Sequence, residues 1–170
     1  ALPIYLDGLG TLAYTWQRST DAASWSTITG AAAATYTLSQ ADVGFYIRSR
    51  VSYTDALGTP ESVASTPTAT KVANINDSPT GALTLSGTPT QNQTLTATST
   101  IADLDGLGTL AYSWQRSTDA ASWSTITGAA AATYTLSQSD VGFFVRSVAS
   151  YTDALGTPES VASTPTATKV

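Results

Sequence analysis

The stretch LAYSWQR, residues 110–116, alternates apolar and polar side chains and places Leu110, Tyr112 and Trp114 on one face. A period of two is typical of a β-strand that buries one side against a core. We therefore expect a central strand here, with Trp114 inside the domain.

Similar short runs lie on both sides of this strand. Residues 81–87 and 93–98 alternate in the same way around the turn Thr88-Pro89-Thr90, and further runs occupy residues 123–126, 133–136, 143–151 and 160–170. In the run 143–151 an exposed Arg146 puts Phe143, Val145, Ala149 and Tyr151 inward, because the opposite phase would bury an unpaired charge. Many short strands between turn signals predict an all-β, antiparallel sandwich. A single helical turn is expected at most, at residues 129–132.

The whole pattern occurs twice. The strand at residues 110–116 recurs 98 positions earlier, and of the 72 residues that align (1–72 on 99–170) 61 are identical. A period near one hundred residues suits an independently folding domain copied in tandem. We predict a first repeat at 1–72, a linker at 73–79 and a complete repeat at 80–170. The same phase in the first copy exposes Arg48 and Arg50 and buries Phe45, Ile47, Val51 and Tyr53.

The first repeat has no counterpart of residues 73–98, which hold the first two expected strands. Either the sequence begins at a boundary inside a longer protein, or another chain supplies these strands. Strand-swapped and donor-strand assemblies work in the second way. Exchange of strands between identical chains is therefore one expected partnership, beside that of neighbouring repeats in one chain.

Composition excludes several kinds of function. The chain has no Cys, Met or His, so it forms no disulfide, thiolate nucleophile, imidazole base or nitrogen-ligated zinc site. The net charge is −5 and there is no basic run, so we expect no nucleic-acid partner. No segment approaches the roughly 18 apolar residues of a membrane span, so no membrane insertion is expected here. Any export signal would lie outside this segment.

Three features together resemble a known family: Trp114 in the third strand, the turn Asp140-Val141-Gly142, and the closing hairpin sequence YTDALG at residues 151–156. They resemble the immunoglobulin-like repeats of giant bacterial surface proteins, including RTX-type adhesins, and the likeness covers essentially the whole chain. The resemblance implies tandem immunoglobulin-like β-sandwiches on the bacterial cell surface. It further implies a structural extender that spaces a distal binding domain from the cell.

The linker NIND, residues 74–77, is similar to the Asp-x-Asn-Asp segment of cadherins, where calcium stiffens the junction between domains. In an immunoglobulin-like sandwich two acidic loops lie at the same end as the linker. Calcium takes six to eight oxygen ligands, which these segments supply. The expected ligands are Asn74, Asn76, Asp77, Asp103, Asp105, Asp153 and Glu159, with Asp7, Asp55 and Glu61 as their counterparts in the first repeat.

Asn74 stands where the cadherin segment has aspartate, which lowers the charge of this ligand set. The alternative is ordinary turn chemistry: Asp105-Gly106 forms a turn, Asp77 caps a strand and Asp153 closes a hairpin.

Two other function classes remain open from the residues. A carbohydrate-binding module would use exposed rings, for which Trp123 and Tyr134 are candidates near loops or edges. An extracellular fibre or surface layer would assemble by strand complementation. Catalysis is not expected, because Asp103 and Asp105 share one loop and no insertion is large enough to build a cleft around them.

Overall fold

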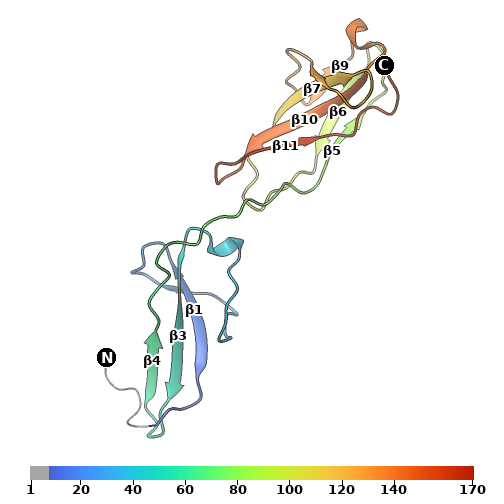
Figure 1. Ribbon diagram of the computed structural model, residues 1–170. Helices are drawn as coiled ribbons and strands as arrows, with labels where there is room; N and C mark the ends of the chain where they lie inside the picture. The colour runs from blue at the N-terminus through green and yellow to red at the C-terminus, as the bar shows by residue number, and fades with distance from the viewer. Residues whose placement is uncertain (1–7) are drawn as a thin grey trace. The chain divides into compact units, whose positions relative to one another are not determined.

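The computed structural model describes residues 8–170 and divides the chain into two compact units, Ala1–Ile75 and Asn76–Val170 (Figure 1). The protein is all-β and every named strand pair is antiparallel, as the alternation predicts. Each unit is described by itself below as unit 1 and unit 2.

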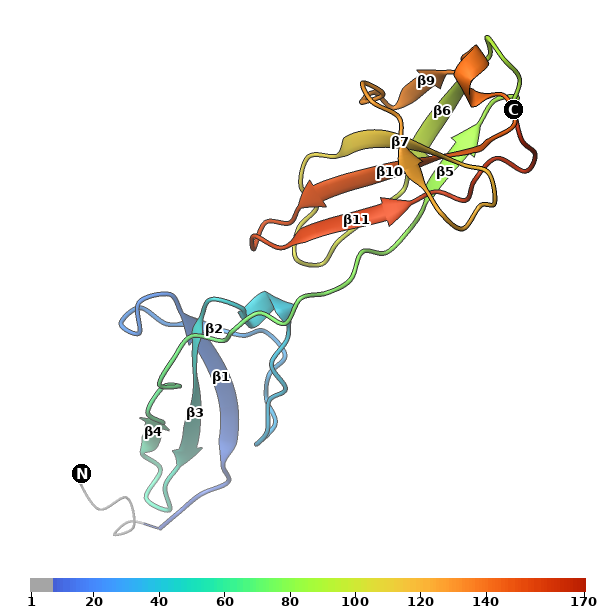
Figure 2. The ribbon, with the colours of Figure 1, turned by 45° about the horizontal axis from the view of Figure 1, so that its top comes forward.

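Unit 2 consists of two sheets that pack face to face, and in Figure 2 strands β5 and β6 lie behind the other sheet. The larger sheet has the order β11 (Pro158–Ala162), β10 (Phe144–Thr152), β7 (Ala111–Ser117) and β8 (Ser124–Thr125). The smaller sheet has the order β5 (Leu83–Ser86), β6 (Thr94–Ser99) and β9 (Thr133–Thr135).

The core of unit 2 lies between these two sheets. Trp114 is fully buried, and its indole Nε1 donates a hydrogen bond to the carbonyl oxygen of Ala131 at 2.9 Å. Val145, Ala149 and Tyr151 are buried, as the phase assigned from Arg146 requires, whereas Phe143 and Arg146 itself are both half-buried. The smaller sheet contributes Leu83, Leu95 and Ala97.

The last strand differs from the prediction. β11 ends at Ala162, whereas residues 160–170 were expected to be strand throughout. Beyond β11 the chain still follows β10, but side-chain hydroxyls now accept from its amides: Ser163 Oγ from Ser147 N and Thr166 Oγ1 from Val145 N, both at 3.1 Å. Pro165, which lacks an N–H, lies between these two residues.

A helical turn at residues 129–132 was a possibility only, because it would be too short to be stable alone. These residues form no helix, and a 3-10 turn occupies Gln138–Asp140 instead. Its amino end is a capping box in which the Ser137 and Asp140 side chains bond each other's backbone N–H groups. Such a reciprocal pair fixes the turn more firmly than alanine propensity alone fixes a single turn.

Unit 1 contains one four-stranded sheet within its described residues, with the order β2 (Ser26–Thr27), β1 (Ala13–Ser19), β3 (Tyr46–Thr54) and β4 (Pro60–Ala64). A 3-10 turn at Gln40–Asp42 lies between β2 and β3 in the chain. Residues 35–37, the counterpart of β9, form no strand.

The predicted phase of β3 in unit 1 holds only in part. Ile47 is buried and Arg50 is exposed, as expected. However, Phe45, Val51 and Tyr53 are only half-buried, and Arg48 is half-buried rather than exposed. Unit 1 lacks a second sheet over this face among its described residues, so inward-pointing side chains stay partly open to solvent.

Candidate functional site

Most of the predicted ligands in unit 2 lie at one end of its larger sheet, where β7 begins and β10 turns into β11. The centre of this group is the buried phenol of Tyr151, whose hydroxyl donates to Asp103 Oδ2 at 2.6 Å. Burial raises the pKa of Tyr151, and the negative charges of Asp103, Glu159 and Asp153 raise it further. Of these three carboxylates, Asp103 contacts the hydroxyl directly.

Two loops interlock beside Tyr151. Ala154 N donates to the carbonyl oxygen of Gly106 at 3.0 Å, and a Cβ atom added to Gly106 would lie 2.7 Å from Ala154 Cβ. Gly106 also has a positive φ of 95°, which favours glycine. In the same loop Asp105 N donates to Asp103 Oδ1 at 2.8 Å. The two acidic loops thus come together, as the sequence predicted.

Two linker residues are tied to these loops. Asp77 N donates to Asp105 Oδ2 at 2.7 Å, and Asn76 Nδ2 donates to Glu159 Oε1 at 2.7 Å. Asn74 belongs to unit 1, and its Oδ1 is buried without a hydrogen bond. The structure therefore joins Asn76 and Asp77 to the carboxylates of unit 2.

Asp153, like Asn74, has a buried oxygen that accepts no hydrogen bond. Its Oδ1 accepts from Leu155 N and Thr157 N, both at 2.8 Å, and the amides of Thr157 and Leu155 lower the pKa of the carboxyl against the opposing effect of burial. Its Oδ2 is buried and accepts no hydrogen bond from the protein. A buried carboxylate oxygen without a partner is costly unless a cation or water serves it.

The donor chemistry fits calcium, but the side chains are engaged elsewhere. In residues 8–170 no three acidic groups lie together in an arrangement that holds a metal ion. Asp103, Asp105 and Asp153 each give at least one oxygen to an amide or a hydroxyl. The Asp153 contacts are those of an ordinary turn, whereas Asp103 and Asp105 are held by Tyr151 and Asp77. Calcium would therefore have to draw on the remaining oxygens or reorient side chains.

The first repeat reproduces only part of this group. Asp55 accepts from Leu57 N at 2.9 Å and from Thr59 N at 2.7 Å, in the same way as Asp153. Glu61 is exposed on β4, and Asp7 lies outside the described residues. Tyr5 stands at the position that corresponds to Asp103, so the first repeat lacks that carboxylate.

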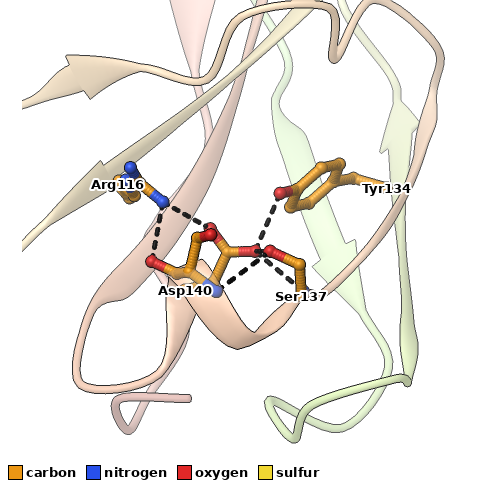
Figure 3. A network of polar contacts seen from close by, with 5 residues as sticks. Arg116, Tyr134, Ser137 and Asp140 are labelled. Atoms are coloured by element: carbon orange, nitrogen blue, oxygen red, sulfur yellow. Dashed lines mark hydrogen bonds and ion pairs between the residues drawn. The ribbon is translucent and has the colours of Figure 1, made fainter.

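A second polar network, around the fully buried Asp140, was not predicted (Figure 3). Asp140 Oδ2 accepts from the Tyr134 hydroxyl and from Ser137 N and Oγ, each at 2.8 Å. Arg116 forms an ion pair with Oδ1 at 3.2 Å. These donors hold the pKa of Asp140 below its usual value although burial opposes them. The spacing Ser137-x-x-Asp140 was the sequence signal for the capping box.

The same network recurs in unit 1 with one weaker contact. Asp42 Oδ2 accepts from the Tyr36 hydroxyl at 2.8 Å and from Ser39 N at 2.9 Å. Arg18, however, lies 3.9 Å from Oδ1, and that oxygen accepts no hydrogen bond. The network fastens the 3-10 turn to the neighbouring strand, and its role is structural.

The two rings considered for sugar binding both have protein partners. The guanidinium of Arg146 lies 4.2 Å from the centroid of the Trp123 ring. Tyr134 packs against Trp114 with ring centroids 5.5 Å apart, and its hydroxyl bonds Asp140. Trp123 thus stacks on a cation, and the half-buried Tyr134 packs against the core.

No helix among residues 8–170 has the length and apolar character needed to cross a membrane. A comparison with curated proteins finds no match. A family model described as Domain of unknown function (DUF8696) matches residues 3–74 and 85–170, which include most of both units. The chain therefore belongs to the DUF8696 family, and the two matched segments fall one in each unit.

Proposed function

We propose that the chain is a pair of immunoglobulin-like structural repeats from the extender region of a bacterial cell-surface adhesin. The observation that carries this proposal is the near-identical copying of one β-sandwich sequence, 61 of 72 aligned residues. Near-identical copies in series suit spacing, where every unit does the same mechanical work. The longest strand has 9 residues, so each unit would add about 30 Å at 3.3 Å per residue.

Small-angle scattering from arrays of one, two and three copies of the chain tests the spacing role. We expect the maximum dimension to grow by a constant increment with each copy. A maximum dimension that stops growing as copies are added would show that the repeats collapse on one another. This result would refute the extender role.

The second part of the proposal is calcium at the acidic end of unit 2. The supporting observations are the unpartnered Oδ2 of Asp153 and the ties from Asn76 and Asp77 to neighbouring carboxylates. Calcium bound by Asp153 Oδ2 and by the carboxylates that Asn76 and Asp77 contact would hold the linker to unit 2 and so restrict bending. Such binding would also stabilise the folded unit, by about 2.7 kcal/mol when calcium is at 100 times its Kd.

The unfolding midpoint measured with excess calcium and again with EDTA tests this site. We expect calcium to raise the midpoint of the wild-type chain, and Asp105→Asn to reduce that rise. Asp119→Asn is the matched control, because Asp119 lies beyond the opposite end of β7 from Asp105 and so away from the proposed calcium site. Equal midpoints in calcium and EDTA would refute the metal site and leave the spacing role standing.

A fibre or surface layer built by strand complementation is the second candidate. The observation that favours it is the half-covered β1–β3 sheet of unit 1, where Leu38 is 48% exposed. Assembly of this kind would make the mass of the chain rise with concentration, which light scattering measures. A constant monomer mass from about 1 μM to 1 mM would exclude it.

A further inference from the structure

The larger sheet of unit 2 has one face against the smaller sheet and one face turned away from it, which we call the outer face (Figure 2). Along β10 the residues of the outer face alternate with the buried residues of the core. Residues that pair across two strands lie on the same face. The central outer-face residues of β10 and their partners on β7 are Phe144, Arg146, Val148, Ser117, Gln115 and Ser113.

The strands of this face carry no negative charge. Glu159 of β11 pairs with the buried Tyr151 and therefore belongs to the inner side. In unit 1 the same positions of β1, β3 and β4 include Arg48 and Arg50 and again no acidic residue. A chain with a net charge of −5 thus keeps its carboxylates away from the outward positions of both larger sheets.

Arg146 is held in a fixed position at the centre of the outer face. Its guanidinium lies 4.2 Å from the centroid of the Trp123 ring, and its Nε donates to Gln115 Oε1 at 2.8 Å. Burial lowers the pKa of Arg146. Among residues 8–170 no carboxylate forms an ion pair with it, and its two Nη groups donate to no side chain or carbonyl. A partly desolvated cation is therefore oriented without an anion to match it.

The same arrangement occurs in unit 1. The guanidinium of Arg48 lies 4.1 Å from the centroid of the Trp25 ring, and its Nε donates to Gln17 Oε1 at 2.8 Å. Arg48, like Arg146, has no acidic partner in the described part of the chain. Two copies with one geometry show that the sequence itself fixes this arginine on its tryptophan.

A lysine lies beside each of these arginines. Lys169 Nζ is 5.5 Å from the centroid of the Phe144 ring, and Phe144 is the next outer-face residue to Arg146 on β10. In unit 1 Lys71 Nζ is 5.7 Å from the centroid of the Tyr46 ring. Each outer face therefore combines two cations with half-buried aromatic rings.

We propose that the outer face of each unit binds a carboxylate-bearing polysaccharide, with Arg48 and Arg146 as the residues that contact its carboxylates. The planar guanidinium matches a carboxylate through two parallel hydrogen bonds, and the neighbouring lysine adds a second positive charge. Phe144 and Val148 offer apolar surface to the carbon face of a sugar ring. This role goes beyond spacing, because the repeats themselves would adhere.

Two observations favour a polysaccharide over an acidic protein as the occupant. The outer face continues beyond Arg146 into exposed hydroxyls, which suit the hydroxyls of a sugar: Ser150, Thr152 and Ser160. The site also recurs in every unit of the chain, and a polymer that repeats one charged sugar can occupy several such sites together. Weak binding at one site is then multiplied along the array.

The test titrates the 170-residue chain, in EDTA, into oligogalacturonate labelled with fluorescein at its reducing end. We expect saturable binding by fluorescence anisotropy. Arg48→Gln combined with Arg146→Gln should weaken this binding by at least about tenfold, because each unit loses its bidentate donor. A neutral maltooligosaccharide of equal length should not bind.

A second double variant controls for net charge. Leu57→Glu with Leu155→Glu lowers the net charge from −5 by two units, as the arginine replacements do. Both leucines are exposed, at 78% and 49%, in the turns that follow β3 and β10. This variant should bind oligogalacturonate much as the wild type does.

A milder change separates the shape of the guanidinium from its charge. Arg48→Lys with Arg146→Lys keeps both positive charges but removes the planar pair of donors. It should also weaken binding, though less than the glutamine variant. Circular dichroism of each variant checks that the sheets remain folded.

The four tryptophans locate the ligand. Indole N–H signals of Trp25 and Trp123 should shift in NMR spectra on addition of oligogalacturonate, whereas those of Trp16 and Trp114 should not, because these two side chains lie on the inner side.

Four results would overturn the proposal: absence of binding in EDTA, equal weakening by the glutamine and glutamate variants, unchanged binding by the lysine variant, or indole shifts at Trp16 and Trp114 alone. Polyglutamate that binds as tightly as oligogalacturonate would also overturn it and would identify an acidic peptide as the occupant. None of these measurements depends on calcium or on the length of the array, so the outer face and the proposed spacing role succeed or fail separately.

Discussion

Asp140 joins three elements of unit 2, because its carboxylate accepts from Tyr134 on β9, from Ser137 at the start of the 3-10 turn, and from Arg116 on β7. A buried carboxylate needs such a complete set of donors, since each missing partner leaves a desolvated charge. Asp140 thereby fixes how the turn that follows β9 sits on the larger sheet.

Replacing Asp140 by alanine should destabilise unit 2 by about 3 kcal/mol, because the Tyr134 hydroxyl and the Ser137 amide would lose their fully buried acceptor. Chemical denaturation followed by near-ultraviolet circular dichroism measures this loss. Ser139→Ala is the control, because unit 1 already has Ala41 at that position. A loss below about 1 kcal/mol for Asp140→Ala would contradict the structural role.

Asp119 gives an acid prediction. Amides of Ser122 and Ala121 and the Ser117 hydroxyl lower its pKa from 3.8 to about 2, and Asp21 in unit 1 shows the same shift to about 2. Since the folded-state pKa is lowered, the stabilisation is complete above pH 3.8 and is lost as the pH falls through about 2. NMR titration of the side-chain carboxyl carbons should show both midpoints near 2, and Asp119→Asn should flatten this part of the stability profile.

At the residue level, the sequence predicted which side chains are buried where a charged residue fixed the inward and outward faces of a strand. Arg146 was enough to orient β10, and Val145 and Ala149 are buried as that argument required. It did not predict the burial of Asp140, because a turn aspartate has the same sequence signature whether it faces solvent or an arginine of a neighbouring strand. The contacts of Asp103 and Asp105 also depend on loops distant in sequence.

At the level of elements, residues 35–37 and 133–135 have one sequence, Thr-Tyr-Thr, and two structures. Residues 133–135 form β9 because β6 supplies hydrogen-bond partners. Residues 35–37 have no such neighbour among the described residues and remain irregular. Strand formation here is decided by the presence of a partner strand rather than by local propensity. For this reason sequence patterns alone overestimate the strand content of unit 1.

The matched pair Leu136→Ala and Leu38→Ala separates these contexts. Leu136→Ala should destabilise unit 2 by about 2–5 kcal/mol, because it opens a cavity in a closed core. Leu38→Ala should cost unit 1 at most about 0.5 kcal/mol, because this side chain is largely exposed. Native-state hydrogen exchange resolves the two units in one sample. Equal losses of stability for the two variants would show that Leu38 is buried in solution.

At the level of the whole molecule, the two units differ in how much of their apolar surface is covered. Unit 2 has a second sheet over its core, while the described part of unit 1 does not. The division at Ile75 and Asn76 falls inside the linker predicted at residues 73–79. The all-β class was predictable from alternation, and the unequal burial of the two repeats became evident only in the structure.

Calorimetry should therefore resolve two unfolding transitions, with unit 1 melting first because it buries less apolar surface. A single cooperative transition would contradict the difference in stability between the units.

The open residues 35–38 also have a consequence for degradation. Proteases bind their substrates as extended, accessible chain, and the sequence TYTLSQ occurs at both 35–40 and 133–138. A protease that cleaves after large apolar or aromatic residues should cut at Tyr36 or Leu38 and spare Tyr134 and Leu136. One sequence in a single chain would thus be both a cleavage site, at residues 35–40, and a resistant site, at residues 133–138.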